Sequence, residues 1–210
     1  MLFRPLGTLN GAATQGAAGI RALAQDQMLA INGDNQNISV AAIIAGIINR
    51  TGTSAATADV LPSVDSILAA IPELSIGDSF RFAIRMALAH ANTLTLGAGM
   101  TAVGTVNVLA SNIREYLLTL TSAPKRTRVV SATTTAASAI LTNILPVDIV
   151  QVGVGMAVTG TGVGAAAKVV AVNIANNTVT VSVVSSASAD NIGVTFTPQM
   201  DLLGVTTGAI

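Results

Sequence analysis

The stretch SFRFAIRMAL at residues 79–88 carries the clearest structural signal in this 210-residue chain. Every second residue is large and apolar, and the positions between them from residue 81 onward hold Arg or Ala. A period of two predicts a half-buried β-strand, whose buried face would be formed by Phe80, Phe82, Ile84, Met86 and Leu88. Further strands are predicted at residues 93–96, 105–109 and 114–121, between turns rich in Gly, Asn and Ser. This spacing predicts an antiparallel sandwich or barrel, and we place a first β domain at 75–124.

A second β part is predicted after the basic segment at residues 124–128. From there to Pro198 the only charged residues are Asp148, Lys168 and Asp190, which is the sharpest change of composition in the chain. We therefore expect a second small β module at 125–198, followed by a C-terminal tail at 199–210. Its short strands are predicted at 127–132, 139–142, 156–159, 168–174, 178–184 and 193–197. The pair Asn176-Asn177 predicts a hairpin turn, because Asn tolerates positive φ.

Helices are predicted only in the N-terminal third. Residues 1–36 are rich in Gly, Ala, Asn and Gln, and we expect an N-terminal arm with one short helix at 20–31. A helical segment follows at 37–74. Its first helix is capped by Ser39 and runs through Ile48, and a second, shorter one starts near Pro62 and is stopped by Pro72. The predicted fold is thus mainly β, with antiparallel β-sandwich or barrel-like parts preceded by an N-terminal arm with two or three short helices.

The composition excludes several classes of protein. The chain is 51% hydrophobic and only 10% charged, with ten cationic and ten acidic side chains and no Cys. Disorder driven by charge, a cationic nucleic-acid interface and thiol chemistry are therefore not expected. Polar residues interrupt the longest uncharged stretches, 129–147 and 149–167, so we expect no membrane span. Residues 5–11 lack the continuous apolar centre of a signal peptide, so we expect none. Surfaces with few ionic groups and no net charge tend to associate, which predicts a surface covered by protein partners.

Two motifs superficially suggest chemistry. Gly153-Val154-Gly155 and the Gly-rich run at residues 160–164 look like nucleotide loops, but neither supplies the third Gly in phase, so turns and bulges explain them better. His90 is the only histidine, and no other His, Cys or acid lies within ten residues of it. A turn histidine is therefore favoured over a zinc ligand or a catalytic base.

The charged residues are interpreted in the same way. Four acids within twenty residues are candidates for a catalytic carboxylate pair: Asp59, Asp65, Glu73 and Asp78. Roles in helix caps, turns and ion pairs with Arg81 or Arg85 explain these acids more simply. The basic cluster of Lys125, Arg126 and Arg128 predicts a solvated linker or a salt bridge across a subunit interface. We accordingly expect no catalytic, cofactor-binding or metal-binding residue and no cofactor.

Several segments carry a resemblance to viral structural proteins. Residues 152–163, 167–172 and 177–182 resemble a small β module that recurs in tailed-phage and other virion proteins. Residues 76–82 and 93–99, with Gly104-Thr105, look like β domains of viral structural proteins. The resemblance covers roughly residues 75–198. The module also occurs in fibres and surface adhesins, so it does not fix a position on the particle.

The resemblance implies a non-enzymatic virion structural protein that decorates or cements a viral capsid, or forms a head fibre. Its partners would be the major capsid protein and copies of itself, as a homotrimer, on the capsid surface after assembly in the host cytoplasm, with no nucleic acid or membrane partner. The arm and the helix at 37–50 are expected to contact neighbouring subunits. The alternative is a tail-fibre or receptor-binding subunit that recognises a host surface glycan, although aromatic rings for sugar binding are scarce. A glycan-degrading enzyme would need two carboxylates in one cleft.

Overall fold

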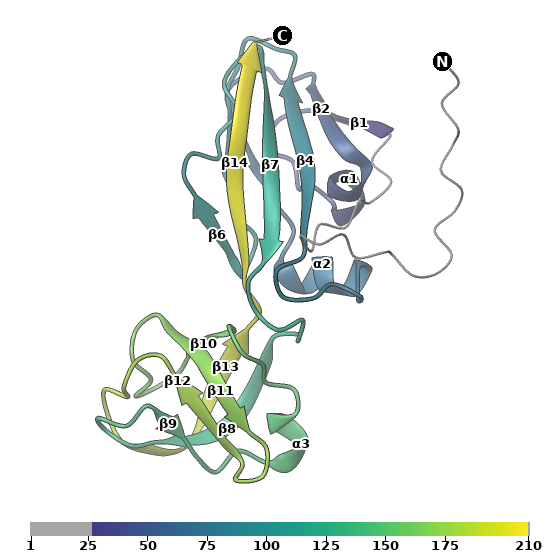
Figure 1. Ribbon diagram of the computed structural model, residues 1–210. Helices are drawn as coiled ribbons and strands as arrows, with labels where there is room; N and C mark the ends of the chain where they lie inside the picture. The colour runs from purple at the N-terminus through teal and green to yellow at the C-terminus, as the bar shows by residue number, and fades with distance from the viewer. Residues whose placement is uncertain (1–26, 210) are drawn as a thin grey trace.

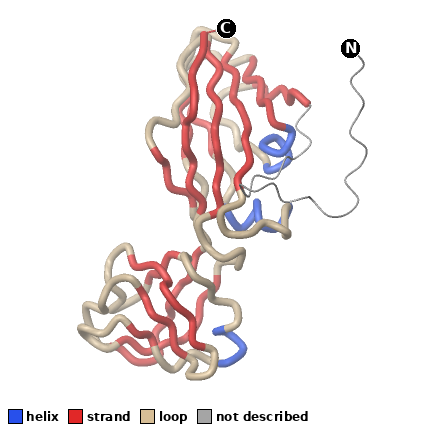
Figure 2. The backbone as a smooth tube through the Cα atoms, in the orientation of Figure 1, coloured by secondary structure: helices blue, strands red, loops and turns tan. Residues whose placement is uncertain are grey.

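The computed structural model describes residues 27–209, which form two bodies with separate hydrophobic cores (Figure 1). The chain is mainly β, with three short helices in the described part (Figure 2). One core draws on residues 38–120 together with Met200 and Leu202. The other draws only on residues 130–196. We call the first unit the body and the second the inserted barrel.

The body is built on a six-stranded sheet with the order β1-β2-β4-β7-β14-β6. Its strands are β1 (Gln27–Asn32), β2 (Gly46–Thr51), β4 (Ser79–Met86), β6 (Met100–Val103), β7 (Asn112–Leu120) and β14 (Met200–Ala209). The pairs β1–β2, β2–β4 and β14–β6 are parallel, whereas β4–β7 and β7–β14 are antiparallel. The predicted antiparallel arrangement therefore applies to the centre of this sheet and not to its edges. A parallel two-stranded sheet, β3 (Thr57–Val60) with β5 (Asn92–Thr95), accompanies it.

Two helices cover one face of the body sheet. In α1 (Val40–Ala45) and α2 (Val64–Ala70), Ser39 and Ser63 accept hydrogen bonds from the backbone amides of Ala42 and Ser66, which caps both helices. Their apolar side chains join the predicted face of β4 in one core, and this inner face contains Phe80, Phe82, Ile84, Met86, Tyr116 and Leu118. The predicted buried face is confirmed for Phe80, Phe82, Ile84 and Met86, whereas Leu88 lies beyond the end of β4 and is only partly buried.

The inserted barrel is antiparallel throughout, with the strand order β8-β13-β10-β11-β12-β9. Its elements are β8 (Arg128–Thr134), β9 (Ile140–Leu141), α3 (Pro146–Ile149), β10 (Ala157–Thr159), β11 (Ala167–Asn173), β12 (Thr178–Val181) and β13 (Ala189–Thr197). A bridge from Thr133 to Thr142 joins the two ends of the sheet, so the barrel is nearly closed. Asn177 has φ 53° in the turn between β11 and β12, as the sequence predicts.

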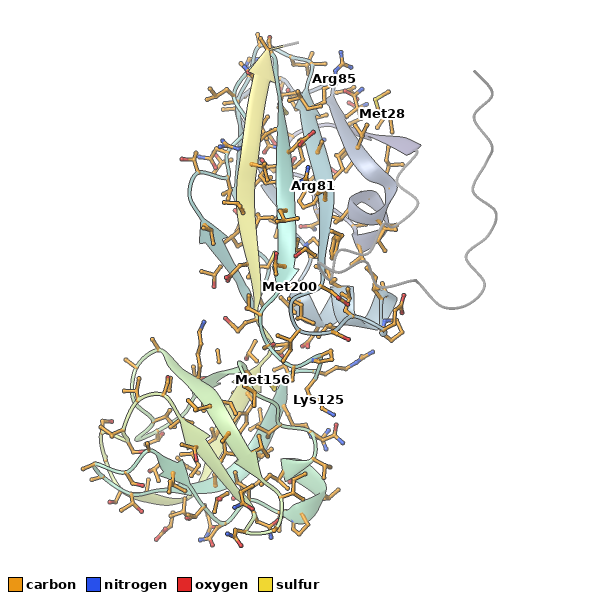
Figure 3. All side chains as sticks on the ribbon, in the orientation of Figure 1. Met28, Arg81, Arg85, Lys125, Met156 and Met200 are labelled. Atoms are coloured by element: carbon orange, nitrogen blue, oxygen red, sulfur yellow. The ribbon has the colours of Figure 1, made fainter. Side chains whose placement is uncertain are left out.

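The barrel is inserted into the connection between two neighbouring strands of the body. Leu120 at the end of β7 pairs with Met200 at the start of β14, and everything between them leaves and returns at this point (Figure 1). The two linker segments are hydrogen-bonded to each other, because Thr121 N donates to Gln199 O at 3.0 Å and Gln199 N donates to Ser122 Oγ at 2.8 Å. Figure 3 labels Met200 and Met156 on either side of this junction.

Three sequence-based expectations are wrong, two of them for the ends of the chain. Residues 200–209, expected as a tail, form β14 in the interior of the body sheet. Residues 27–32, expected to belong to an arm and partly to a helix, form β1, while residues 1–26 lie outside the described part. The segment predicted at 105–109 contributes only one bridge, from Val108 to Asn92, instead of a strand.

The first predicted helix is also too long, and the segment at 37–74 holds strands as well as helices. It stops at Ala45, because Gly46 has φ 96° and turns the chain directly into β2. Isoleucine at positions 47 and 48 therefore points to opposite faces of a strand instead of sharing a helix face: Ile48 is fully buried and Ile47 is exposed. Within residues 27–209, no helix has the length and apolar character needed to cross a membrane.

Candidate interaction surfaces

The buried charges of the body form a structural network. Arg50 extends from β2, and its Nη1 and Nη2 donate to the carbonyl oxygens of Ile31 and Gly33 at 2.6 Å each. Its Nε lies 2.6 Å from Oδ2 of Asp59, and both side chains are fully buried. This pair joins β2, β3 and the turn after β1.

The carboxylate oxygens of Asp59 accept further hydrogen bonds from groups of the body. Its Oδ1 accepts from Gln36 N at 2.9 Å, and its Oδ2 accepts from Nδ2 of Asn92 at 2.7 Å. Asp59, a candidate acid in the sequence, therefore holds a buried cation and orders three segments. The sequence analysis missed the buried role of Arg50. The pattern that could have indicated it is a single cation directly after the run Ile47-Ile48-Asn49 that follows Gly46.

The other candidate acids have separate structural roles. Asp65 in α2 accepts from the backbone amide of Thr127 at 2.9 Å, which ties the body to the linker of the inserted barrel. Asp78 is buried and accepts from Ser75 N at 2.9 Å in the turn before β4. Glu73 is exposed in the turn after α2. The contacts of Asp65 and Asp78 are thus those of a junction and a turn.

His90 lies half-buried in the loop between β4 and β5. The hydroxyl of Ser54 donates to Oδ2 of Asp34 at 2.6 Å, and this bond, with a smaller contribution from His90, lowers the pKa of Asp34. Ser54 N also donates to Oδ1 of the same carboxylate at 3.1 Å, so the contacts of Ser54 with Asp34 are those of an exposed turn. Among residues 27–209 no three His, Cys, Asp or Glu side chains are grouped as a metal site.

The Gly-rich motifs lie in turns of the inserted barrel, and the basic cluster spans the linker and the first residue of β8. Gly155 and Gly162 adopt φ of 84° and 75° in turns that flank β10, as expected for turn glycines. Gly155 lies against the linker, since a Cβ there would come within 2.6 Å of Thr121 O. Arg128, for which a solvated linker or a salt bridge across a subunit interface was predicted, approaches Asp148 of the same chain at 3.4 Å. Both side chains of that pair are partly exposed to solvent.

Among residues 27–209, no helix packs on the second face of the body sheet, which is a candidate interaction surface. We call it the outer face; it consists of the side chains of β1, β2, β4, β7, β14 and β6 that point away from α1 and α2. Its two central strands carry Arg81 and Arg85 on β4 and Glu115 on β7. Figure 3 labels the two arginines. Apolar side chains flank this centre on both sides, with exposed fractions of 59% for Met28, 38% for Ile47, 38% for Leu203 and 43% for Val103. Such flanks are unusual for a sheet face that meets only water, because exposed faces of antiparallel sheets are normally polar.

A shallow hollow of about 250 Å³ opens in the outer face between the charged centre and the β2 flank. Small residues form its floor, because Ala83 and Gly46 leave space between longer neighbours. Its walls come from Ile47, Arg81, Ile113 and Glu115. The hollow could receive an apolar side chain from a partner, with charged groups at its rim.

The inserted barrel exposes a second apolar surface around α3. We call it the α3 patch; it consists of Leu145, Val147 and Val150, which are 56%, 65% and 43% exposed. Pro146 at the first turn of α3 fixes the chain so that only Ile149 of this helix turns into the core. The α3 patch and the outer face lie on different bodies, so the chain offers two separate apolar contact surfaces.

Comparison with known proteins identifies no relative of this chain. No protein-family model matches it, and no curated protein or solved structure matches it either.

Proposed function

We propose that this chain is a non-enzymatic structural protein of a virus particle, which decorates or cements the capsid through contacts with several subunits. The observation that carries the proposal is the pairing of two apolar contact surfaces on two bodies of one chain, the outer face and the α3 patch. Together with the resemblance of residues 75–198 to virion β modules, this arrangement supports a role in bridging neighbouring subunits. The partners would be the major capsid protein and further copies of the chain, at the capsid surface.

The physical basis is the addition of many modest contacts. Apolar surface removed from water contributes about 25 cal/mol per Å², and much of that gain offsets the loss of freedom on association. One small contact therefore binds weakly, but a subunit that touches two neighbours at once gains the second contact at high effective concentration. Repetition over a symmetric shell then stabilises the whole particle.

The structure requires a different assignment of the segments that contact neighbouring subunits. The helix expected to touch neighbouring subunits, α1, packs into the core of the body, where Ala42 and Ile43 are fully buried. Contact with neighbours is accordingly assigned to the outer face, the α3 patch and residues 1–26.

Co-sedimentation of the purified chain with intact and stripped virus-like shells tests the proposal. We expect saturable binding at a copy number set by the symmetry of the shell, and weaker binding of Val147→Asp, which places a charge in the α3 patch. Val170→Asp is the matched control, because Val170 is 53% exposed on β11 and lies outside the patch. Failure to bind shells combined with binding to host cells or glycans would support a receptor-binding fibre subunit instead.

A further inference from the structure

We infer that the outer face is the site where a second copy of this chain docks, face to face, about a two-fold axis. The inference deepens the proposed function and rests on it for its biological setting, while its test requires only the purified chain. It is drawn from the strand register, the placement of charges and the area of the face.

The strand register makes the charged centre complementary to itself. Arg81 pairs with Leu117, Ala83 with Glu115, and Arg85 with Ile113, so Glu115 lies one row from each arginine on the neighbouring strand. A two-fold axis parallel to the strands and midway between β4 and β7 lays β4 of each copy over β7 of the other. Glu115 of one copy then lies between Arg81 and Arg85 of the second copy, and the reciprocal contact forms by symmetry.

The same rotation brings the two apolar flanks together. Strands β1 and β2 of one copy lie over β6 and β14 of the other, because these pairs occupy mirrored positions in the strand order. By the register, Met28 and Ile47 lie in the row of Ala83, whereas Leu203 and Val103 lie in the row of Arg81, so the two apolar flanks meet diagonally, one row apart. An axis through the centre thus places charge against opposite charge and apolar side chains against apolar side chains.

The area of the outer face is sufficient for a specific interface. Five spacings between six strands and the eight residues of β4 give roughly 24 Å by 27 Å, or about 650 Å² per copy. Specific interfaces start at about 600 Å² per partner. Two sheets packed in this way lie about 10 Å apart with strands aligned to within about 30°, as in β-sandwiches. The second copy thus supplies the missing layer of a sandwich whose other layer is α1 and α2.

Charge reversal tests the docking in solution. Light scattering and sedimentation of the full chain over a concentration series should show a dimer. We expect Glu115→Arg, and separately the double variant Arg81→Glu/Arg85→Glu, to weaken dimerisation at least about tenfold, because each creates like-charge contacts twice per dimer. An equimolar mixture of the two variants should regain wild-type affinity as a heterodimer, since every contact in it again joins opposite charges.

Controls separate docking from folding. Arg126→Glu reverses an exposed cation in the linker, outside the outer face, and should leave the dimer unchanged. Far-UV circular dichroism reports whether each variant is folded, and Leu203→Ser at the exposed flank provides a second disrupting variant if a charge reversal prevents folding.

Several outcomes would overturn the inference: a monomeric wild-type chain, a trimer such as the resemblance implies, a dimer unaffected by Glu115→Arg, or a mixture that remains monomeric. A monomer that still saturates shells would overturn the docking and leave the proposed function intact. A dimer that does not bind shells would support the docking and overturn the proposed function.

Discussion

The guanidinium of Arg50 and the carboxylate of Asp59 meet at 2.6 Å with both side chains fully buried. Isolated charges are very unfavourable in a protein interior, so such a pair persists only when hydrogen bonds satisfy its remaining atoms. Here the carbonyl oxygens of Ile31 and Gly33 accept from Arg50, and the backbone amide of Gln36 donates to Asp59. The pair therefore fixes how β1 and the turn after it attach to the rest of the body.

Asp59→Asn should destabilise the body by about 3–5 kcal/mol, because it leaves the Arg50 cation buried without a counter-charge. Urea unfolding followed by circular dichroism measures the change. Asp65→Asn is the control, since its amide oxygen can still accept from the exposed Thr127 amide, and it should cost less than about 1 kcal/mol. Equal effects of the two variants would contradict a special role for the buried pair.

Tyr116 should make the protein sensitive to alkali. Its hydroxyl donates to Val106 O at 2.5 Å, its ring stacks on Phe82, and burial raises its pKa above the ordinary value of 10.0. The folded state keeps the proton when the unfolded state releases it. This contribution to stability is therefore complete below pH 10.0 and is lost as the pH rises further.

The chain has a single Tyr and no Trp, so tyrosinate absorbance reports Tyr116 alone. We expect this absorbance to rise together with loss of the circular dichroism signal of the fold. Tyr116→Phe should remove the corresponding pH dependence, at a loss of about 0.5–1.5 kcal/mol at neutral pH. Reversible titration near pH 10.0 with the fold intact would show that the hydroxyl is not sequestered.

The body should fold without the inserted barrel. Replacing residues 122–198 by Asn-Gly joins Thr121 to Gln199, which are already hydrogen-bonded neighbours, through a turn suited to hairpins. Because the body core contains no residue of the barrel, cooperative thermal unfolding should persist. An unfolded product would mean that the body depends on contacts across the junction, of which the Asp65–Thr127 bond is one.

Gly46→Ala should destabilise the body by about 1–3 kcal/mol, since φ of 96° is strained for any residue with a Cβ. Gly193→Ala is a matched control in β13, where φ is not positive and a Cβ would approach nothing closer than 3.5 Å. Urea unfolding of both variants checks the difference. Similar stabilities would indicate that the transition from α1 to β2 relaxes to accept the methyl group.

Removal of residues 2–26 should leave a folded body with reduced binding to shells, if the N-terminal segment contacts neighbouring subunits. A deletion through residue 36 would be misleading, because it removes the backbone partners of Arg50 and Asp59. Co-sedimentation with shells measures binding, and circular dichroism verifies folding. Full binding by the shorter deletion would refute a role for this segment.

Local patterns predicted a large part of the fold. The alternation at residues 79–88 identified β4 and most of its buried face, and Pro62 and Pro72 bounded α2. Six short strands of the inserted barrel were found near their observed positions. Of the candidate sites, the turn glycines were interpreted correctly from the residues alone, whereas Arg50 and the outer face were missed. Both depend on strand partners that lie far apart in the sequence.

What the sequence determined by itself is therefore local: where the chain alternates, where it is capped and where glycine or asparagine turns it. The tertiary structure decided that residues 200–209 return to pair with β7 instead of forming a tail, and that Ile47 and Ile48 take opposite faces of a strand. The physical reason is that a strand gains its hydrogen bonds and buried area only from its neighbours in the sheet. Only the assembled sheet shows that α1 and α2 cover one face and that no helix in the described part of the chain covers the other.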